Sequence, residues 1–199
     1  AVWGSKSTLR KNFMISTPLQ DDDAVTFSMM GRQVNEVRHL LDLGKLIIFT
    51  ASGEWIIEGD AAGILTPGEI NPKQFTGNGS GTIPPLVVGG NALYVQARGS
   101  VIRDLSFEQQ TENYKGNELT IFASHLFDNY TIRDWAYQQI PHSIVWCVRS
   151  DGALLGMTYV REHQVFGWHR HDFAGVEQGV DYLADGDHVA DGSILATGG

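Results

Sequence analysis

The sequence predicts an all-β fold that resembles part of a β-propeller, and three observations lead to this prediction. Short apolar runs rich in branched and aromatic residues alternate with turns along the 199 residues, of which 23 are glycine. A strand-turn-strand unit recurs at intervals of roughly one propeller blade. Helical patterns are scarce, with a single short candidate.

The recurring unit is an apolar run, a turn that contains glycine, and a second apolar run. Its three copies are Leu46–Ile57, Ala92–Arg103 and Val145–Leu155, and a weaker echo is Tyr182–Gly186. Each copy is typical of a β-hairpin, because glycine accepts the positive φ that hairpin turns require. The turn glycines Gly53, Gly99 and Gly152 lie 46 and 53 residues apart. This spacing is close to the ~40–50 residues of a four-stranded blade.

The repeat favours a partial ring of about three to four blades over the alternative, a β-sandwich. Further strands are expected at Ala1–Trp3, Ala24–Ser28, Leu119–Phe122, Thr131–Tyr137, Met157–Val160 and Val165–Trp168, and one helix at Val34–Leu43. A partial ring leaves blade edges that neighbouring chains would have to cover.

We expect one propeller-like domain over residues 1–173, followed by a short acidic segment over residues 174–199. All-β domains of about 200 residues commonly fold as one unit. The first residues already look like the interior of a strand, and the last segment is short and acidic. We therefore expect the chain to be a fragment of a longer protein.

The net charge of −9 disfavours direct binding to nucleic acid, because affinity for phosphate comes mainly from Lys and Arg. Asp21–Asp23 and the acidic residues from Asp181 onward are typical of solvated loops. The longest apolar runs, such as Leu46–Phe49, are far shorter than the ~20 residues of a transmembrane helix. No membrane partner is expected.

No motif in the chain predicts catalysis or a cofactor. His169 and His171 alternate on one predicted strand and would share a face, but their spacing with His163 matches no established metal site. We expect no metal, and keep a metal-dependent hydrolase as a remote alternative. The loop Gly77–Gly81 lacks the Lys-Ser/Thr ending of a phosphate-binding loop. The chain is therefore predicted not to be an enzyme.

Three tryptophans lie on predicted strands within one third of the chain. Trp135, Trp146 and Trp168 have apolar or small neighbours, namely Ala136, Val145 and Gly167. We expect the three indoles to pack between strands of adjacent blades or to form a contact with another subunit.

The same region closely resembles a family of phage and prophage virion proteins, which are similar in organisation to the tail nozzle and tail tubular proteins of short-tailed phages. The resemblance is carried by Asp134–Gln139, Ser143–Tyr159, Arg161–Glu162 and Val165–His171, and extends through Trp3–Lys6, Asn12–Phe13, Gln33–Arg38, Gly53–Trp55, Pro84–Leu86 and Val101–Leu105. It spans residues 1–172. After Phe173 the family continues with further β segments, whereas this chain has only the short acidic segment over residues 174–199.

The resemblance implies a structural component of a bacteriophage tail, of nozzle, adaptor or hub type, that acts by protein-protein assembly. Its partners would be other tail proteins or copies of itself in a ring. Its location would be the virion tail, and the host cytoplasm during assembly. The family has no recognised catalytic residues to carry over. The alternative from another class is a β-domain that binds or cleaves carbohydrate on the host surface.

Overall fold

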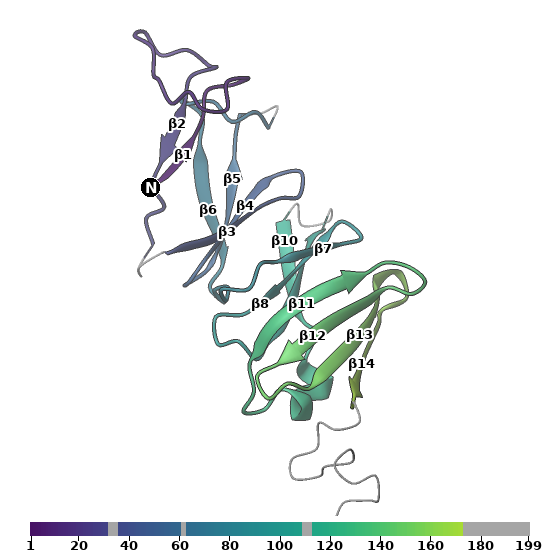
Figure 1. The fold of residues 1–199 in the computed structure, drawn as a ribbon. Coiled ribbons are helices and arrows are strands. Elements are labelled where there is room, and N and C mark those ends of the chain that lie inside the picture. Colours follow the sequence, from purple (N-terminus) through teal and green to yellow (C-terminus); the bar gives the residue numbers. More distant parts are fainter. Residues whose placement is uncertain (32–35, 61–62, 109–112, 173–199) are drawn as a thin grey trace, which may run out of the picture. The chain divides into compact units, whose positions relative to one another are not determined.

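The computed structural model describes residues 1–31, 36–60, 63–108 and 113–172, which form antiparallel sheets (Figure 1). One sheet has two strands. Three sheets have four strands, and in each of these every strand pairs with the next one along the chain. This up-and-down order is that of a propeller blade. The structure confirms the all-β class and the repeat of antiparallel hairpins.

The strands are distributed over the sheets in chain order. The two-stranded sheet contains β1 (Val2–Gly4) and β2 (Val25–Phe27). The first four-stranded sheet contains β3 (Val37–Asp42), β4 (Leu46–Thr50), β5 (Glu54–Glu58) and β6 (Asn71–Thr76). The second contains β7 (Leu86–Val88), β8 (Asn91–Val95), β9 (Ile102–Glu108) and β10 (Asn113–Glu118). The third contains β11 (Ile132–Gln138), β12 (Ile144–Arg149), β13 (Leu154–Val160) and β14 (Val165–His171).

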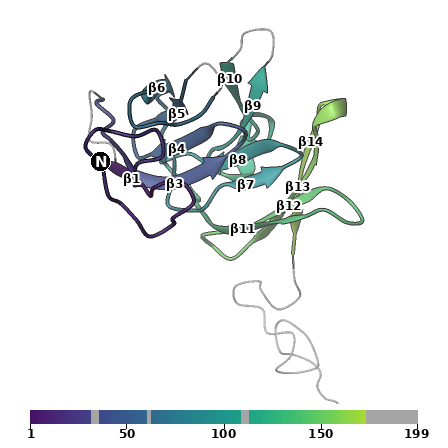
Figure 2. The same cartoon turned by 90° about the horizontal axis from the view of Figure 1, so that it is seen from above.

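The chain divides into two compact units, residues 1–132 and 133–199. The first unit holds the two-stranded sheet and the first and second four-stranded sheets, and the second unit holds nearly all of the third sheet (Figure 2). The predicted acidic segment, residues 174–199, and the weak repeat at Tyr182–Gly186 lie outside the described residues. No helix in the described part of the chain is long and apolar enough to span a membrane.

The three predicted hairpins form the central strand pair of each four-stranded sheet. They are β4–β5, β8–β9 and β12–β13, with Ile48 opposite Trp55, Leu93 opposite Asp104, and Cys147 opposite Leu155. Central strands have neighbours on both sides, and they are the most deeply buried strands here. Their apolar runs are the part of each blade that the sequence shows most clearly.

The first four-stranded sheet has both faces covered within its own unit. One face packs against the second sheet, in a cluster formed by Ile47, Phe49, Ile56, Ala92, Tyr94, Leu105 and Tyr114. The rings of Phe49 and Tyr94 are 5.1 Å apart between centroids. The opposite face, with Ile48, Trp55 and Ile57, packs against partly buried residues that include Val2 and Phe27 of the two-stranded sheet. Burial of both faces explains why β4 and β5 are apolar at nearly every position.

Two predicted elements are wrong. The helix expected over Val34–Leu43 is the strand β3 from Val37 onward, and β3 pairs with the buried strand β4. Pairing with β4 overrides the helical spacing of the leucines. The strand expected at Leu119–Phe122 instead leads into a short 3-10 helix, η1 (Ile121–Leu126). A second 3-10 helix, η2 (Arg161–His163), joins β13 to β14.

The three turn glycines serve different purposes. Gly99 and Gly152 have positive φ, +80° and +90°, as predicted. The loop that contains Gly152 is longer than two residues, since the hydrogen bond that closes it runs from the backbone N–H of Arg149 to Ala153 O over 2.9 Å. Gly53 is not in the left-handed region, contrary to prediction. It is needed for space, since a Cβ there would lie 2.6 Å from Thr76 O.

Replacing Gly152 with valine tests the backbone role of this turn. We expect Gly152→Val to lower the free energy of unfolding by about 1–3 kcal/mol, because a β-branched residue is strained at positive φ. No atom lies within 4 Å of a Cβ built at this position, so the cost comes from the backbone alone. Gly68→Val is the matched control, because Gly68 has equally open space without a positive φ. Equal melting temperatures for the two variants would contradict the assignment.

Candidate functional site

The third four-stranded sheet has one buried face and one exposed face, because successive strand residues point to opposite sides. The buried face carries Val145, Cys147, Arg149, Leu155, Met157 and Tyr159. The exposed face, here called the outer face, carries Ile144, Trp146, Val148, Leu154, Val165, His169 and His171. Val148 is 39% exposed and Val165 is 47% exposed. A largely apolar sheet face is thus open to solvent.

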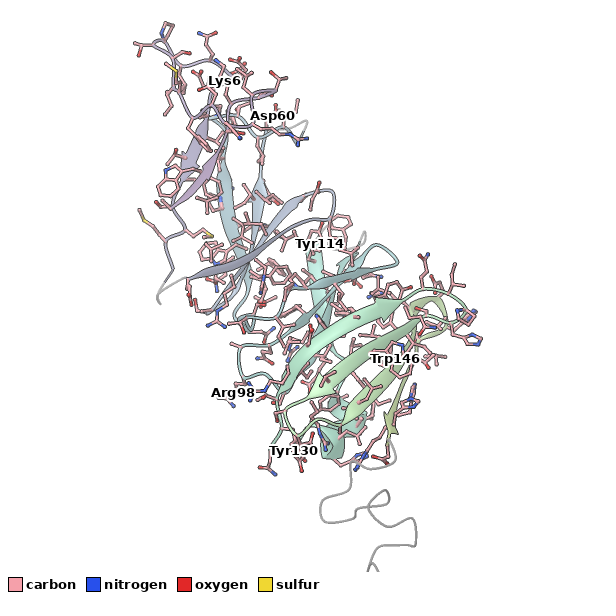
Figure 3. All side chains as sticks on the ribbon, viewed as in Figure 1. Lys6, Asp60, Arg98, Tyr114, Tyr130 and Trp146 are labelled. Atoms are coloured by element: carbon pink, nitrogen blue, oxygen red, sulfur yellow. The ribbon has the colours of Figure 1, made fainter. Side chains whose placement is uncertain are left out.

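Three rings lie together on the outer face, from the strands β12 and β14. The ring centroid of Trp146 is 5.8 Å from that of His169 and 4.9 Å from that of His171. The two imidazoles are 4.8 Å apart, and Nδ1 of His169 lies 2.7 Å from Nε2 of His171. At this distance the N–H of one imidazole donates a hydrogen bond to the nitrogen of the other. Figure 3 labels Trp146 on the third sheet.

Neighbouring residues hold this ring cluster in place. The indole N–H of Trp146 donates to Oε1 of Gln138 over 2.7 Å. Gly156 lies opposite His169 on β13, and a Cβ at Gly156 would collide with the His169 ring. Partial burial and the nearby His171 lower the pKa of His169, which favours its neutral form. The absence of a side chain at Gly156 lets the imidazole pack directly over the backbone of β13.

The three tryptophans singled out in the sequence differ in burial and in the face of the sheet on which they lie. Trp135 is buried, with 7% exposed. Trp146 is partly exposed on the outer face, and Trp168, opposite Met157, is partly exposed on the other face of the sheet. The alternation of His169 and His171 was visible in the sequence, whereas their contact with Trp146 depends on the pairing of β13 with both β12 and β14.

Of the three histidines considered as metal ligands in the sequence, the structure brings only His169 and His171 together. His163 is exposed on η2. Among residues 1–31, 36–60, 63–108 and 113–172, no group of three or more His, Cys, Asp or Glu side chains gathers around one point. His169 and His171 are the two of these three histidines whose rings are in contact.

A second exposed apolar surface lies on the long connection from β1 to β2, residues 5–24. The buried carboxylate of Asp23 organises this loop: it accepts hydrogen bonds from the backbone N–H of Ser16 and of Gln20, each over 2.9 Å, and pairs with Lys6 Nζ at 3.0 Å. These hydrogen bonds and the Lys6 ammonium lower the pKa of Asp23 strongly. The loop exposes Leu9, Phe13, Met14, Ile15 and Leu19.

A cavity of about 560 Å³ opens at one end of the first four-stranded sheet. Its lining includes the carboxylates of Asp42, Glu58 and Asp60 together with apolar side chains such as Leu65. Lys45 Nζ lies 3.4 Å from Glu58 Oε1 and neutralises part of this charge. The cavity is therefore net acidic and disfavours anionic ligands.

Glu54 is a fully buried carboxylic acid between the first and second four-stranded sheets. The hydroxyl of Thr76 donates a hydrogen bond to Oε2, and the hydroxyl of Tyr94 and the backbone of Asn78 are the other polar groups beside this carboxyl group. Burial raises the pKa of Glu54 to about 7. A pKa shifted in this way is typical of catalytic acids, but the carboxyl group of Glu54 is out of reach of a substrate, with none of the residue exposed.

No protein-family model matches the chain, and no curated protein matches it.

The buried Glu54 predicts a pH dependence of stability. The folded pKa of about 7 lies above the ordinary glutamate pKa of 4.5, so folding takes up a proton between these two pH values. The free energy of unfolding should fall as the pH rises from about 4.5 to 7, by about 3 kcal/mol in total, and this contribution should then stay constant. Glu54→Gln should remove the slope and be more stable than wild type in mildly alkaline buffer. Urea unfolding at several pH values across this range measures the pH dependence of the unfolding free energy. Glu69→Gln, at an exposed position, is the control and should keep the wild-type pH dependence.

The tryptophans should differ in their contribution to stability. We expect Trp135→Ala to cost about 3–5 kcal/mol of unfolding free energy, because it empties a buried site. Trp146→Ala should cost distinctly less, because its ring is already partly in contact with water. Melting temperatures of the two variants test this order, and a Trp146 variant as unstable as the Trp135 variant would show that the outer face belongs to the core.

Proposed function

We propose that this chain is a structural component of a bacteriophage virion tail, of nozzle, adaptor or hub type, which acts by protein-protein assembly. Its place is the tail of the virion, and the host cytoplasm while the particle is built. The resemblance of Asp134–His171 to phage tail proteins supports this proposal. The observation that carries it furthest is the exposed outer face.

The outer face differs from the faces of the first four-stranded sheet. In the first sheet, both faces are covered by other strands of the same unit. On the outer face, Ile144, Val148, Leu154 and Val165 remain at least partly exposed. Exposed contiguous apolar surface commonly marks a site of protein-protein contact.

The partner that fits this face is a β-sheet of a neighbouring copy of the chain. Within the first unit, two four-stranded sheets already pack face to face through aliphatic and aromatic side chains. A sheet from another copy offers the same shape and the same kind of side chain. Repetition of one such contact around an axis produces a ring, which is the form of assembly that the phage-tail resemblance implies.

A carbohydrate-binding function is the second candidate, and the half-exposed Trp146 is the observation that favours it. An indole ring beside hydrogen-bonding groups such as His171 and Gln138 can stack against a sugar. In that case the Trp146→Ala variant would lose signal on a glycan array. Wild-type protein that binds no glycan but associates with itself would instead support assembly.

A charge placed on the outer face should weaken assembly without unfolding the protein. We expect Val148→Glu to leave the melting temperature close to that of wild type, because the side chain is already exposed to solvent, and to reduce self-association and incorporation into particles. A carboxylate buried in an apolar interface without a partner is strongly unfavourable. Sedimentation velocity and the content of purified virions measure these two effects.

Val87→Glu is the matched control, because Val87 is 46% exposed on β7 of the second sheet. It places the same charge on another exposed strand. If both variants assemble as wild type does, the outer face is not an interface. An electron cryomicroscopy map of the virion with no density for this chain in the tail would refute the proposed function itself.

A further inference from the structure

The two histidines of the outer face bring their nitrogens together at a single point. Nδ1 of His169 and Nε2 of His171 lie 2.7 Å apart. Both residues belong to β14 and point to the same side, since they are two positions apart on a strand. Neutral imidazole is a preferred ligand of zinc, copper and nickel ions.

We propose that His169 and His171 form a two-imidazole binding site for a divalent transition metal ion such as Zn²⁺. Zinc binds histidine nitrogen at about 2.0–2.1 Å, and a tetrahedral angle places two such nitrogens about 3.3 Å apart. The two nitrogens would need to move apart by about 0.6 Å, and the rings would need to rotate so that both lone pairs point at the ion. The ion takes the place of the hydrogen-bonded proton between the two nitrogens.

The surroundings of the pair suit a metal site of this kind. Trp146 packs against both imidazoles, and its own N–H is fixed by Gln138 over 2.7 Å. Contacts that orient metal-binding histidines strengthen binding by reducing the freedom that the ligands lose. The lack of a side chain at Gly156 leaves room for the His169 ring.

The site supplies two ligands and leaves two positions of a tetrahedral ion open. The described residues contain no third His, Cys, Asp or Glu within the group. Water completes the coordination in the isolated protein, and because the outer face is exposed, a donor group from a neighbouring molecule can take the place of water. Metal binding itself does not depend on the proposed function, since it requires only this chain.

Calorimetric titration of the full chain tests the site. The protein is purified without an affinity tag, stripped with EDTA and titrated with ZnCl₂ near neutral pH. We expect one ion per chain in wild type, and binding in His171→Gln that is weaker by at least the roughly 10- to 100-fold that loss of a group supporting a ligand costs, because a direct ligand is removed. His163→Gln, on the neighbouring η2, and His188→Gln, outside the described residues, are controls that should bind as wild type does.

Quenching of Trp146 fluorescence by Cu²⁺ gives a second measurement that locates the ion. The Trp146 ring lies 4.9 Å from that of His171, so a bound Cu²⁺ should quench it, and Trp146→Phe should lose that part of the quenching. If His171→Gln lowers the melting temperature, His171→Asn and His169→Gln provide the same comparison. Absence of zinc binding in wild type, or binding that His188→Gln abolishes and His171→Gln leaves intact, would overturn the proposal.

Discussion

The need to cover both faces of each four-stranded sheet shapes this structure more than any other constraint. A sheet buries apolar side chains on two sides only if another layer lies against each side. In the first unit, sheet-to-sheet packing provides one layer and the two-stranded sheet with its neighbouring loops provides the other. The central strands β4 and β5 can therefore be almost continuously apolar.

The third sheet meets the same constraint on one side only. Its buried face resembles the first sheet, with Cys147, Leu155 and Met157 almost fully buried. Burial raises the pKa of the Cys147 thiol to about 12, so it behaves as a small apolar side chain. Its outer face mixes valine and leucine with an indole and two imidazoles. A mixed face of this kind tolerates water and can still exchange water for a partner.

The strand pattern was predictable from the sequence because it depends on local chemistry. Branched and aromatic runs around glycine turns located the central hairpin of each sheet, and positive φ was predicted correctly for Gly99 and Gly152. The strand β3, the first of its four-stranded sheet, was missed because Leu40 and Leu41 also fit helical spacing. The need for glycine at Gly53 arises from Thr76, more than 20 residues away. The contact of Trp146 with His169 and His171 likewise depends on the pairing register of β12, β13 and β14, which spacing along the sequence does not determine.

The position of β14 explains how one face can serve two kinds of contact. β14 is the last strand in the order of the third sheet, whereas β12 and β13 lie inside it. The apolar residues Val148 and Leu154 therefore lie on the two inner strands, beside the turn that joins them, and the imidazoles of His169 and His171 lie on the edge strand. Apolar packing is strongest where water is excluded from the centre of a contact, whereas a metal ion needs open positions that donors can reach. The arrangement of the four strands assigns each of these requirements to a different part of the same surface.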